Sequence, residues 1–219
     1  MSLTLIATPI GNSQDIGFRA LEKLKKADVI IVEEFKECSL FLRSHGISGK
    51  EMFNLNEHSS KEDVAELVGL CEQKEVALIT DCGTPGFCDP GADLIAACRK
   101  KTIPVDSIPG ASSLMTLLSL SSTRLDQFLF RGFLPAENEQ REKAWLELRL
   151  EKRAVVILDT PYRFGKMIDE LKKHLPDRRL LLGVNLTAED QIVWEGRAEK
   201  LTKEQFPKKA EFILLIYPV

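Results

Sequence analysis

The stretch Val76-Ala77-Leu78-Ile79-Thr80-Asp81-Cys82-Gly83-Thr84-Pro85-Gly86 decides the fold, because an apolar run ends there at a loop of small, turn-forming residues. The run Val76 to Thr80 has the composition of a buried strand, and a helix is expected beyond the loop, from about Ala92 to Lys101. Open α/β sheets bind ligands beyond the carboxyl ends of their strands. We therefore expect a ligand at residues 81–90.

Three further apolar strands are interrupted by loops of the same kind. These loops are Thr8-Pro9-Ile10-Gly11-Asn12, Pro109-Gly110-Ala111-Ser112-Ser113 and Asp159-Thr160-Pro161-Tyr162-Arg163. Such loops carry function more often than the elements they connect. Four of them at strand ends indicate one shared crevice.

Strand and helix patterns alternate along the first half of the chain. We expect strands at residues 3–7, 29–32, 52–55, 76–80 and 105–108, and helices at 13–26, 38–45, 61–73, 92–101 and 112–121. Ser60, with Asp63 three residues later, resembles a capping box at the start of the third helix. Alternation of this kind predicts a mostly parallel sheet in an α/β domain.

A second series of elements follows, with strands expected at residues 128–133, 154–158, 180–186, 192–194 and 211–217 and helices at 138–150 and 164–174. The strands at 180–186 and 192–194 are too close in sequence to be parallel neighbours, because a parallel crossover needs about a dozen residues. The second sheet is therefore expected to be mixed. We place the two α/β domains at residues 1–121 and 122–219, and a crevice between such halves is a common ligand site.

Composition excludes several classes of protein. The chain is 44% apolar and 29% charged, which is typical of a globular domain, and its net charge of −3 gives no overall attraction to a polyanion, although the second half is mildly basic. Cys82 and Cys88 lie near Asp81 and Asp89, but no histidine accompanies them, so we expect no metal. Without a basic-flanked leader or an apolar run of about 20 residues, the protein is expected to be cytoplasmic.

Several familiar chemistries lack their motifs. The chain contains no G-x-G-x-x-G, Walker A, G-x-S-x-G or H-E-x-x-H sequence. The histidines His45, His58 and His174 are far apart, and a surface or structural role is expected for each, least firmly for His58.

Seven segments, taken in chain order, resemble the tetrapyrrole methylase superfamily, the class III S-adenosylmethionine-dependent methyltransferases. Within it, the chain is similar to the branch that contains the bacterial 16S rRNA 2′-O-ribose cytidine methyltransferase. The matching segments are Ala7–Asn12, Val76–Gly91, Ile108–Ser113, Gly132–Pro135, Asp159–Arg163, Asn185–Thr187 and Glu211–Ile216. Together they span nearly the whole chain.

The resemblance implies two α/β domains, commonly in a homodimer, with S-adenosyl-L-methionine in the cleft between them. Gly83 to Gly86 expose backbone without bulky side chains, and hydroxyl groups at a helix N-terminus suit a ribose or a carboxylate. The cofactor-binding residues expected on both grounds are Gly83, Thr84, Pro85, Gly86, Ser112 and Ser113. The resemblance alone implies five more: Pro9, Leu134, Asp159, Leu186 and Glu211. We expect the homodimer to pair through the apolar helix around Leu114–Leu118 unless that helix is buried within its own subunit.

Methyl transfer from a sulfonium mainly requires alignment of the two reactants. A ribose hydroxyl must also lose its proton, and a carboxylate of raised pKa would serve as the base. Asp81 and Glu33 are the candidates, since each follows a buried-looking strand where packing can raise the pKa. Asp81 has the alternative role of binding the amides of its own loop.

The chain departs from the rRNA branch on the expected substrate side. The family's Glu-Asp-Thr-Arg is here Glu33-Glu34-Phe35-Lys36, its Arg-Glu-Leu-Thr is Val184-Asn185-Leu186-Thr187, and its His-Asp-His is Asn56-Glu57-His58. The family's C-terminal extension has no counterpart before Val219, so we expect a short, divergent member.

Three functions are therefore compatible with the sequence. Methylation of RNA, with the ribosomal small subunit as partner, is favoured. Its expected substrate-binding residues are Lys36, His58, Arg131, Arg163 and Lys166. Methylation of a small molecule such as a tetrapyrrole is disfavoured, because Thr8-Pro9-Ile10-Gly11-Asn12 replaces the Gly-Pro-Gly-Asp of those enzymes. The third function is that of a non-catalytic S-adenosylmethionine-binding homologue.

Overall fold

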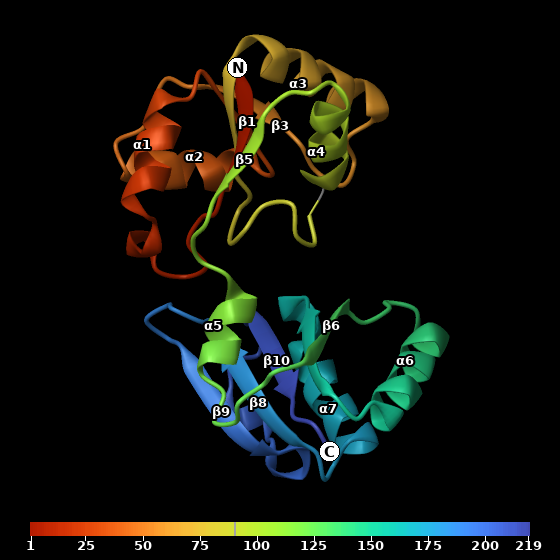
Figure 1. Cartoon of the computed structure of the whole chain (residues 1–219). Coiled ribbons are helices and arrows are strands. Elements are labelled where there is room, and N and C mark those ends of the chain that lie inside the picture. Colours follow the sequence, from red (N-terminus) through yellow and green to blue (C-terminus); the bar gives the residue numbers. More distant parts are fainter. Residues whose placement is uncertain (90) are drawn as a thin grey trace. The chain divides into compact units, whose positions relative to one another are not determined.

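The computed structural model describes residues 1–89 and 91–219, which separate into two compact α/β units, residues 1–112 and 113–219 (Figure 1). The division falls before helix α5 (Ser113–Ser119), earlier than the boundary that we expected after residue 121. Helix α5 packs against strands β8 (Arg179–Val184) and β10 (Phe212–Ile216), so it belongs to the second unit.

The first unit is built on a five-stranded sheet in the order β3-β2-β4-β1-β5, and every pair of neighbouring strands is parallel, as expected. Its strands are β1 (Ser2–Ile6), β2 (Val29–Val32), β3 (Glu51–Asn54), β4 (Glu75–Leu78) and β5 (Val105–Ile108). Strand β4 lies between β1 and β2, so the loops that follow these three strands leave the sheet at the same edge.

Helices cover both faces of this sheet (Figure 1). Helices α1 (Phe18–Lys26) and α2 (Phe35–Ser44) share a core with Ile6, Ile30 and Ile79, while α3 (Lys61–Gln73) and α4 (Gly91–Lys100) share one with Leu3 and Leu78. Successive strand residues point to opposite faces, and both faces are buried. This explains why β2, in the interior of the sheet, is continuously apolar in sequence.

Two helix starts show how local sequence sets the boundaries. The capping box is confirmed, because Ser60 Oγ accepts a hydrogen bond from Asp63 N at 3.1 Å and Ser60 N donates to Asp63 Oδ2 at 2.7 Å. The helix expected from residue 13 to 26 is instead divided. A 3₁₀ turn, η1 (Ser13–Asp15), is followed by extended backbone at Gly17, and α1 begins only at Phe18.

The second unit has a mixed sheet in the order β6-β7-β10-β8-β9, which confirms the prediction. Strands β6 (Phe128–Phe133) and β7 (Ala154–Asp159) are parallel, whereas β10, β8 and β9 (Ile192–Arg197) pair antiparallel with their neighbours. Helices α6 (Asn138–Leu150) and α7 (Phe164–His174) pack on one face over a core centred on Trp145 and Phe164.

The described residues also form short 3₁₀ segments: η1, η2 (Pro161–Arg163), η3 (Ala198–Lys200) and η4 (Lys203–Gln205). Of the helices formed by residues 1–89 and 91–219, none combines the length and the apolar character needed to cross a membrane.

Candidate active site

The loops after β1, β4 and β5 are joined by direct hydrogen bonds. Thr8 N donates to Gly83 O at 2.8 Å, and Gly83 N donates to Thr8 O at 3.1 Å, which forms a one-residue antiparallel bridge between two loops. Thr84 Oγ1 donates to Ala111 O at 3.1 Å. The structure therefore brings together the three first-unit loops that the sequence singled out.

Two glycines of the central loop have left-handed backbones, with φ of 82° at Gly83 and 80° at Gly86, a conformation that favours glycine. A Cβ on Gly86 would lie 3.1 Å from side-chain atoms of Leu5 and Ile95, and Gly86 N donates to the carboxylate of Asp89 at 2.7 and 2.9 Å. A Cβ on Gly83 would meet only Ile10 Cγ2, at 3.6 Å. A side chain at position 86 would therefore press against Leu5 and Ile95, whereas there is space beside Gly83.

The other expected contacts in these loops differ in exposure. Pro85 is buried, while Pro9, Thr84, Ser112 and Ser113 are half-buried. Pro90, the last residue of the expected ligand loop, lies outside the described residues.

Glu33 and Asp81 follow the neighbouring strands β2 and β4, and each hydrogen-bonds to the other's loop. Asp81 Oδ1 accepts from Glu34 N at 3.2 Å and from Cys38 Sγ at 3.6 Å, and Glu33 Oε2 accepts from Asp81 N at 3.4 Å. Asp81 therefore binds an amide of the adjacent loop. The two candidate bases form one linked pair.

Burial raises the pKa of Glu33, and the negative charges of Asp81, Asp89 and Glu34 raise it further, although the hydrogen bond from Asp81 N acts in the opposite direction. Burial likewise raises the pKa of Asp81, against the lowering effect of its bonds to Cys38 and Glu34 N. Loss of solvation disfavours the charged form of a carboxyl group. Both groups thus bind a proton more readily than an exposed carboxylate.

A pocket of about 440 Å³ opens beside this pair. It is lined by Glu33, Glu34, Asn56, Glu57, His58, Cys88 and Asp89. His58, which the sequence assigned to the substrate, therefore shares a pocket with Glu33. Lys36 is not part of the lining, and its exposed Nζ lies 3.9 Å from Glu37 Oε1. Asp89, which the sequence analysis considered only as a metal ligand, also lines the pocket.

In the second unit, the Asp159 side chain is fully buried and its oxygens are already bound. Oδ2 accepts from Arg141 Nη2 at 2.8 Å, and Oδ1 accepts from Thr160 N at 2.8 Å and from Arg163 Nη1 at 3.3 Å. Arg141 Nε also donates to both carboxylate oxygens of Glu170, at 2.9 Å. This ion cluster fixes the loop after β7. Because both carboxylate oxygens of Asp159 are already bound, the backbone of this residue is the part that can contact a cofactor.

Arg141 was missed by sequence reasoning, although a signal existed. Arg141, Ala144, Trp145 and Leu148 are the buried residues of α6, and their spacing is that of an apolar helix stripe. An arginine within such a stripe is buried, and a buried charge requires a partner of opposite sign. The sequence pattern thus predicts a buried carboxylate but does not identify which one.

The loop after β8 is held by Glu211. Asn185 N donates to Glu211 O at 2.8 Å and Glu211 N donates to Asn185 Oδ1 at 3.1 Å, which brings together two of the segments that carried the resemblance. Asn185 and Thr187 have φ of 46° and 68°, rare values for residues with a side chain. Burial raises the pKa of Glu211. The side chains of Leu134 and Leu186 are buried.

The three second-unit cations expected at the substrate differ in their surroundings. Arg163 pairs with Asp159, and Lys166 Nζ lies 3.0 Å from Asn138 Oδ1, on the edge of the same ion cluster. Arg131 is half-buried on β6 and takes no part in these ion pairs. Within the part of the chain that the structure describes, no three His, Cys, Asp or Glu side chains are grouped to hold a metal ion.

Comparison with known proteins places the chain in a family. Residues 2–202 match the family model of tetrapyrrole (corrin/porphyrin) methylases. The chain is 32% identical to the ribosomal RNA small subunit methyltransferase I of Neisseria meningitidis serogroup B, with 99% of this chain and 76% of that protein covered. It is 35% identical to the protein of the same name from Coprothermobacter proteolyticus, with 98% and 96% covered.

Solved structures share the fold at lower identity. A diphthine synthase has a TM-score of 0.76 at 18% identity, covering 99% of this chain and 90% of that one. A uroporphyrin-III C-methyl transferase from Thermus thermophilus, complexed with S-adenyl homocysteine, has a TM-score of 0.67 at 15% identity, covering 99% and 97%. The chain therefore belongs to the tetrapyrrole methylase family, as its loops indicated. It is an S-adenosylmethionine-dependent methyltransferase.

Proposed function

We propose that this chain methylates a ribose 2′-hydroxyl of small-subunit ribosomal RNA with S-adenosylmethionine as the methyl donor. The observation that carries the proposal is the half-buried Glu33, whose pKa is raised, on the wall of a pocket beside the joined loops. The names of the curated relatives, at 31–35% identity over 94–99% of this chain, support RNA as the substrate class.

The joined first-unit loops fit an adenosyl cofactor. The cofactor would lie in the space beside Gly83, which the Cβ of any larger residue at this position would enter. Pro9 and Thr84 flank this position on the two bridged loops. When bound, S-adenosylmethionine supplies a methyl group on a sulfonium that is already strongly electrophilic. Leu134, Leu186, Glu211 and the Asp159 backbone remain the predicted contacts of the second unit, and Ser112 and Ser113 those between strand β5 and helix α5.

The chain's own chemical task is then to position the hydroxyl and to remove its proton. Glu33 accepts that proton, and its raised pKa makes it a stronger base than an exposed glutamate. Asp81 positions Glu33 by donating its backbone N–H to Glu33 Oε2, and its own carboxylate holds Glu34 N. Alignment of this kind can lower the barrier by roughly 7 kcal/mol or more.

Binding of RNA would use one cation of the first unit and three of the second. Lys36 and Lys166 are exposed, and Arg163 and Arg131 are half-buried, so all four present charge that can reach a phosphate. His58 lines the same pocket as Glu33 and is the residue that we assign to the ribose or base.

The first test is calorimetry with S-adenosylmethionine and with its demethylated product, in the presence of a chelator. We expect micromolar-range binding of both that the chelator does not change. Absence of binding to either compound would contradict the assignment of the cofactor to this chain.

The second test identifies the substrate. Mass spectrometry of rRNA nucleosides from cells with and without the gene should show one 2′-O-methyl nucleoside that disappears in the deletion. If all rRNA modifications persist while the protein binds cofactor, a small-molecule substrate or a non-catalytic role replaces the proposal.

A further inference from the structure

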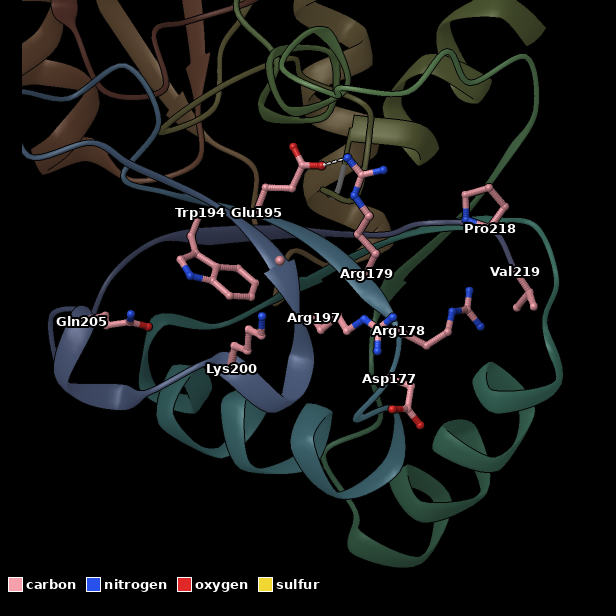
Figure 2. Close-up of a pocket in the computed structure, with 11 residues that line it drawn as sticks. Asp177, Arg178, Arg179, Trp194, Glu195, Arg197, Lys200, Gln205, Pro218 and Val219 are labelled. Atoms are coloured by element: carbon pink, nitrogen blue, oxygen red, sulfur yellow. Dashed lines mark hydrogen bonds and ion pairs between the residues drawn. The ribbon is translucent and has the colours of Figure 1, made fainter.

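A second pocket, of about 870 Å³, lies in the second unit at the end of the sheet where β8 begins and β9 ends (Figure 2). None of the residues assigned to methyl transfer lines it. Its cations are Arg178, Arg179, Arg197 and Lys200, against the carboxylates of Asp177 and Glu195. The pocket therefore carries an excess of positive charge in a chain whose net charge is −3.

Two of these cations are held by the protein itself. Arg178 donates to the carbonyl oxygens of Glu151 and Tyr217, at 3.2 and 2.5 Å. Arg179 pairs with Glu195, as the dashed line in Figure 2 marks, and its guanidinium lies 4.6 Å from the centre of the Tyr217 ring. These contacts build a rigid wall.

The other two cations have no such partner. In residues 1–89 and 91–219, neither Arg197 nor Lys200 forms an ion pair. Arg197 is also the direct cross-strand neighbour of Arg179, and like charges in opposite positions of a sheet destabilise it. An anion bound between the guanidinium groups of Arg179 and Arg197 would reduce their mutual repulsion.

Trp194 adds an aromatic surface to the same pocket. Figure 2 shows its indole above Lys200, on the side of β9 toward Gln205. The ring lies against Gly196, where a Cβ would come within 2.8 Å of Trp194 Cζ2, so this glycine is what allows the indole to lie along the strand. The ring is half-buried and lines the pocket, whereas Trp145, the other tryptophan, is fully buried.

We propose that this pocket binds a single-stranded segment of RNA, with phosphates at Arg197 and Lys200 and a base against Trp194. Unpaired cations and an aromatic ring that line one pocket are the features that proteins use for single-stranded nucleic acid. RNA as the ligand rests on the proposed function, but this pocket and the Glu33 pocket share no lining residue. It would hold a part of the substrate other than the reacting ribose.

The test measures binding of a short fluorescein-labelled single-stranded RNA to Arg197→Gln/Lys200→Gln. We expect about a tenfold loss of affinity and a salt dependence whose log–log slope is shallower by about 1.4, because roughly 0.7 is lost for each phosphate contact to a single strand. The matched control is Arg149→Gln/Lys208→Gln, which removes two exposed second-unit cations outside the pocket. The control should bind RNA like the wild type.

Fluorescence tests the aromatic contact without altering it. Trp145→Phe leaves Trp194 as the sole tryptophan, since the chain has two. RNA should quench its emission, and inorganic polyphosphate, which offers charge without bases, should not. Equal binding of polyphosphate and RNA with unchanged Trp194 emission would overturn the proposal in favour of a general anion site.

Methyl transfer to small ribosomal subunits distinguishes this inference from the proposed function. If Arg197→Gln/Lys200→Gln binds and methylates RNA like the wild type, the pocket inference is wrong and the proposed function stands. If the variant loses RNA affinity but the wild type methylates no rRNA, the pocket inference stands and the proposed substrate is wrong.

Discussion

At the scale of single residues, Gly83 and Gly86 have similar backbones but different surroundings, and this difference can be measured. Gly83→Ala should lower the free energy of unfolding by about 1–2 kcal/mol, the cost of a left-handed residue with a Cβ. It should also weaken S-adenosylmethionine binding at least tenfold, because the new methyl enters the space assigned to the cofactor. Calorimetry and urea denaturation on the same preparation measure both effects.

Gly46→Ala is the matched control for this substitution. Gly46 has φ of 70° and nothing within 4 Å of its Cβ position, so the backbone cost is the same and no site is filled. Its cofactor affinity should be unchanged. Equal loss of affinity in both variants would mean that strain, and not the occupied space, explains the effect at Gly83.

The pH dependence of kcat/KM tests the role of Glu33. The base must be deprotonated, so activity should rise with pH through the pKa of Glu33, which burial places above the usual glutamate value. Glu33→Gln should lower activity roughly a hundredfold or more and remove this acidic limb. Glu34→Gln should keep the activity and move the limb to lower pH, because it removes a neighbouring negative charge. A limb that survives in Glu33→Gln would show that another group is the base.

At the scale of elements, α6, β7 and α7 are joined by the buried cluster of Arg141, Asp159 and Glu170. Arg141→Met should lower the free energy of unfolding by about 3–5 kcal/mol, since it leaves buried carboxylates without a partner. Urea denaturation checks this, with Arg149→Met, an exposed position on the same helix, as the control with little effect. A loss below about 1 kcal/mol in Arg141→Met would show that the carboxylates simply take up protons or water.

The strands were predictable because burial on both sides of a sheet leaves a continuous apolar run, as at Val29–Val32. The capping box at Ser60 was predictable because its two bonds are local. Contacts between distant segments could not be predicted in this way. The hydrogen bond from Glu34 N to Asp81 and the position of Arg197 opposite Arg179 depend on the order and register of the strands. The full burial of Asp159 depends likewise on Arg141, which comes from another element.

At the scale of the whole molecule, we predict a homodimer. Helix α5 buries Leu117 within its own unit, while Met115 is 60% exposed, so an apolar side chain remains at the surface. At micromolar concentration, light scattering should give a mass twice that of the 24.6 kDa chain. The Met115→Glu variant should have a lower measured mass, closer to that of a single chain. A wild-type protein of single-chain mass would contradict the prediction.

The central claim, methyl transfer to a ribose of small-subunit rRNA, is tested most directly with purified components. Small ribosomal subunits from a deletion strain would be incubated with the protein and radiolabelled S-adenosylmethionine, and the rRNA digested to nucleosides. We predict that the label appears in one 2′-O-methyl nucleoside and is strongly reduced with Glu33→Gln. Cofactor binding without any labelled RNA or ribosomal particle would contradict the account.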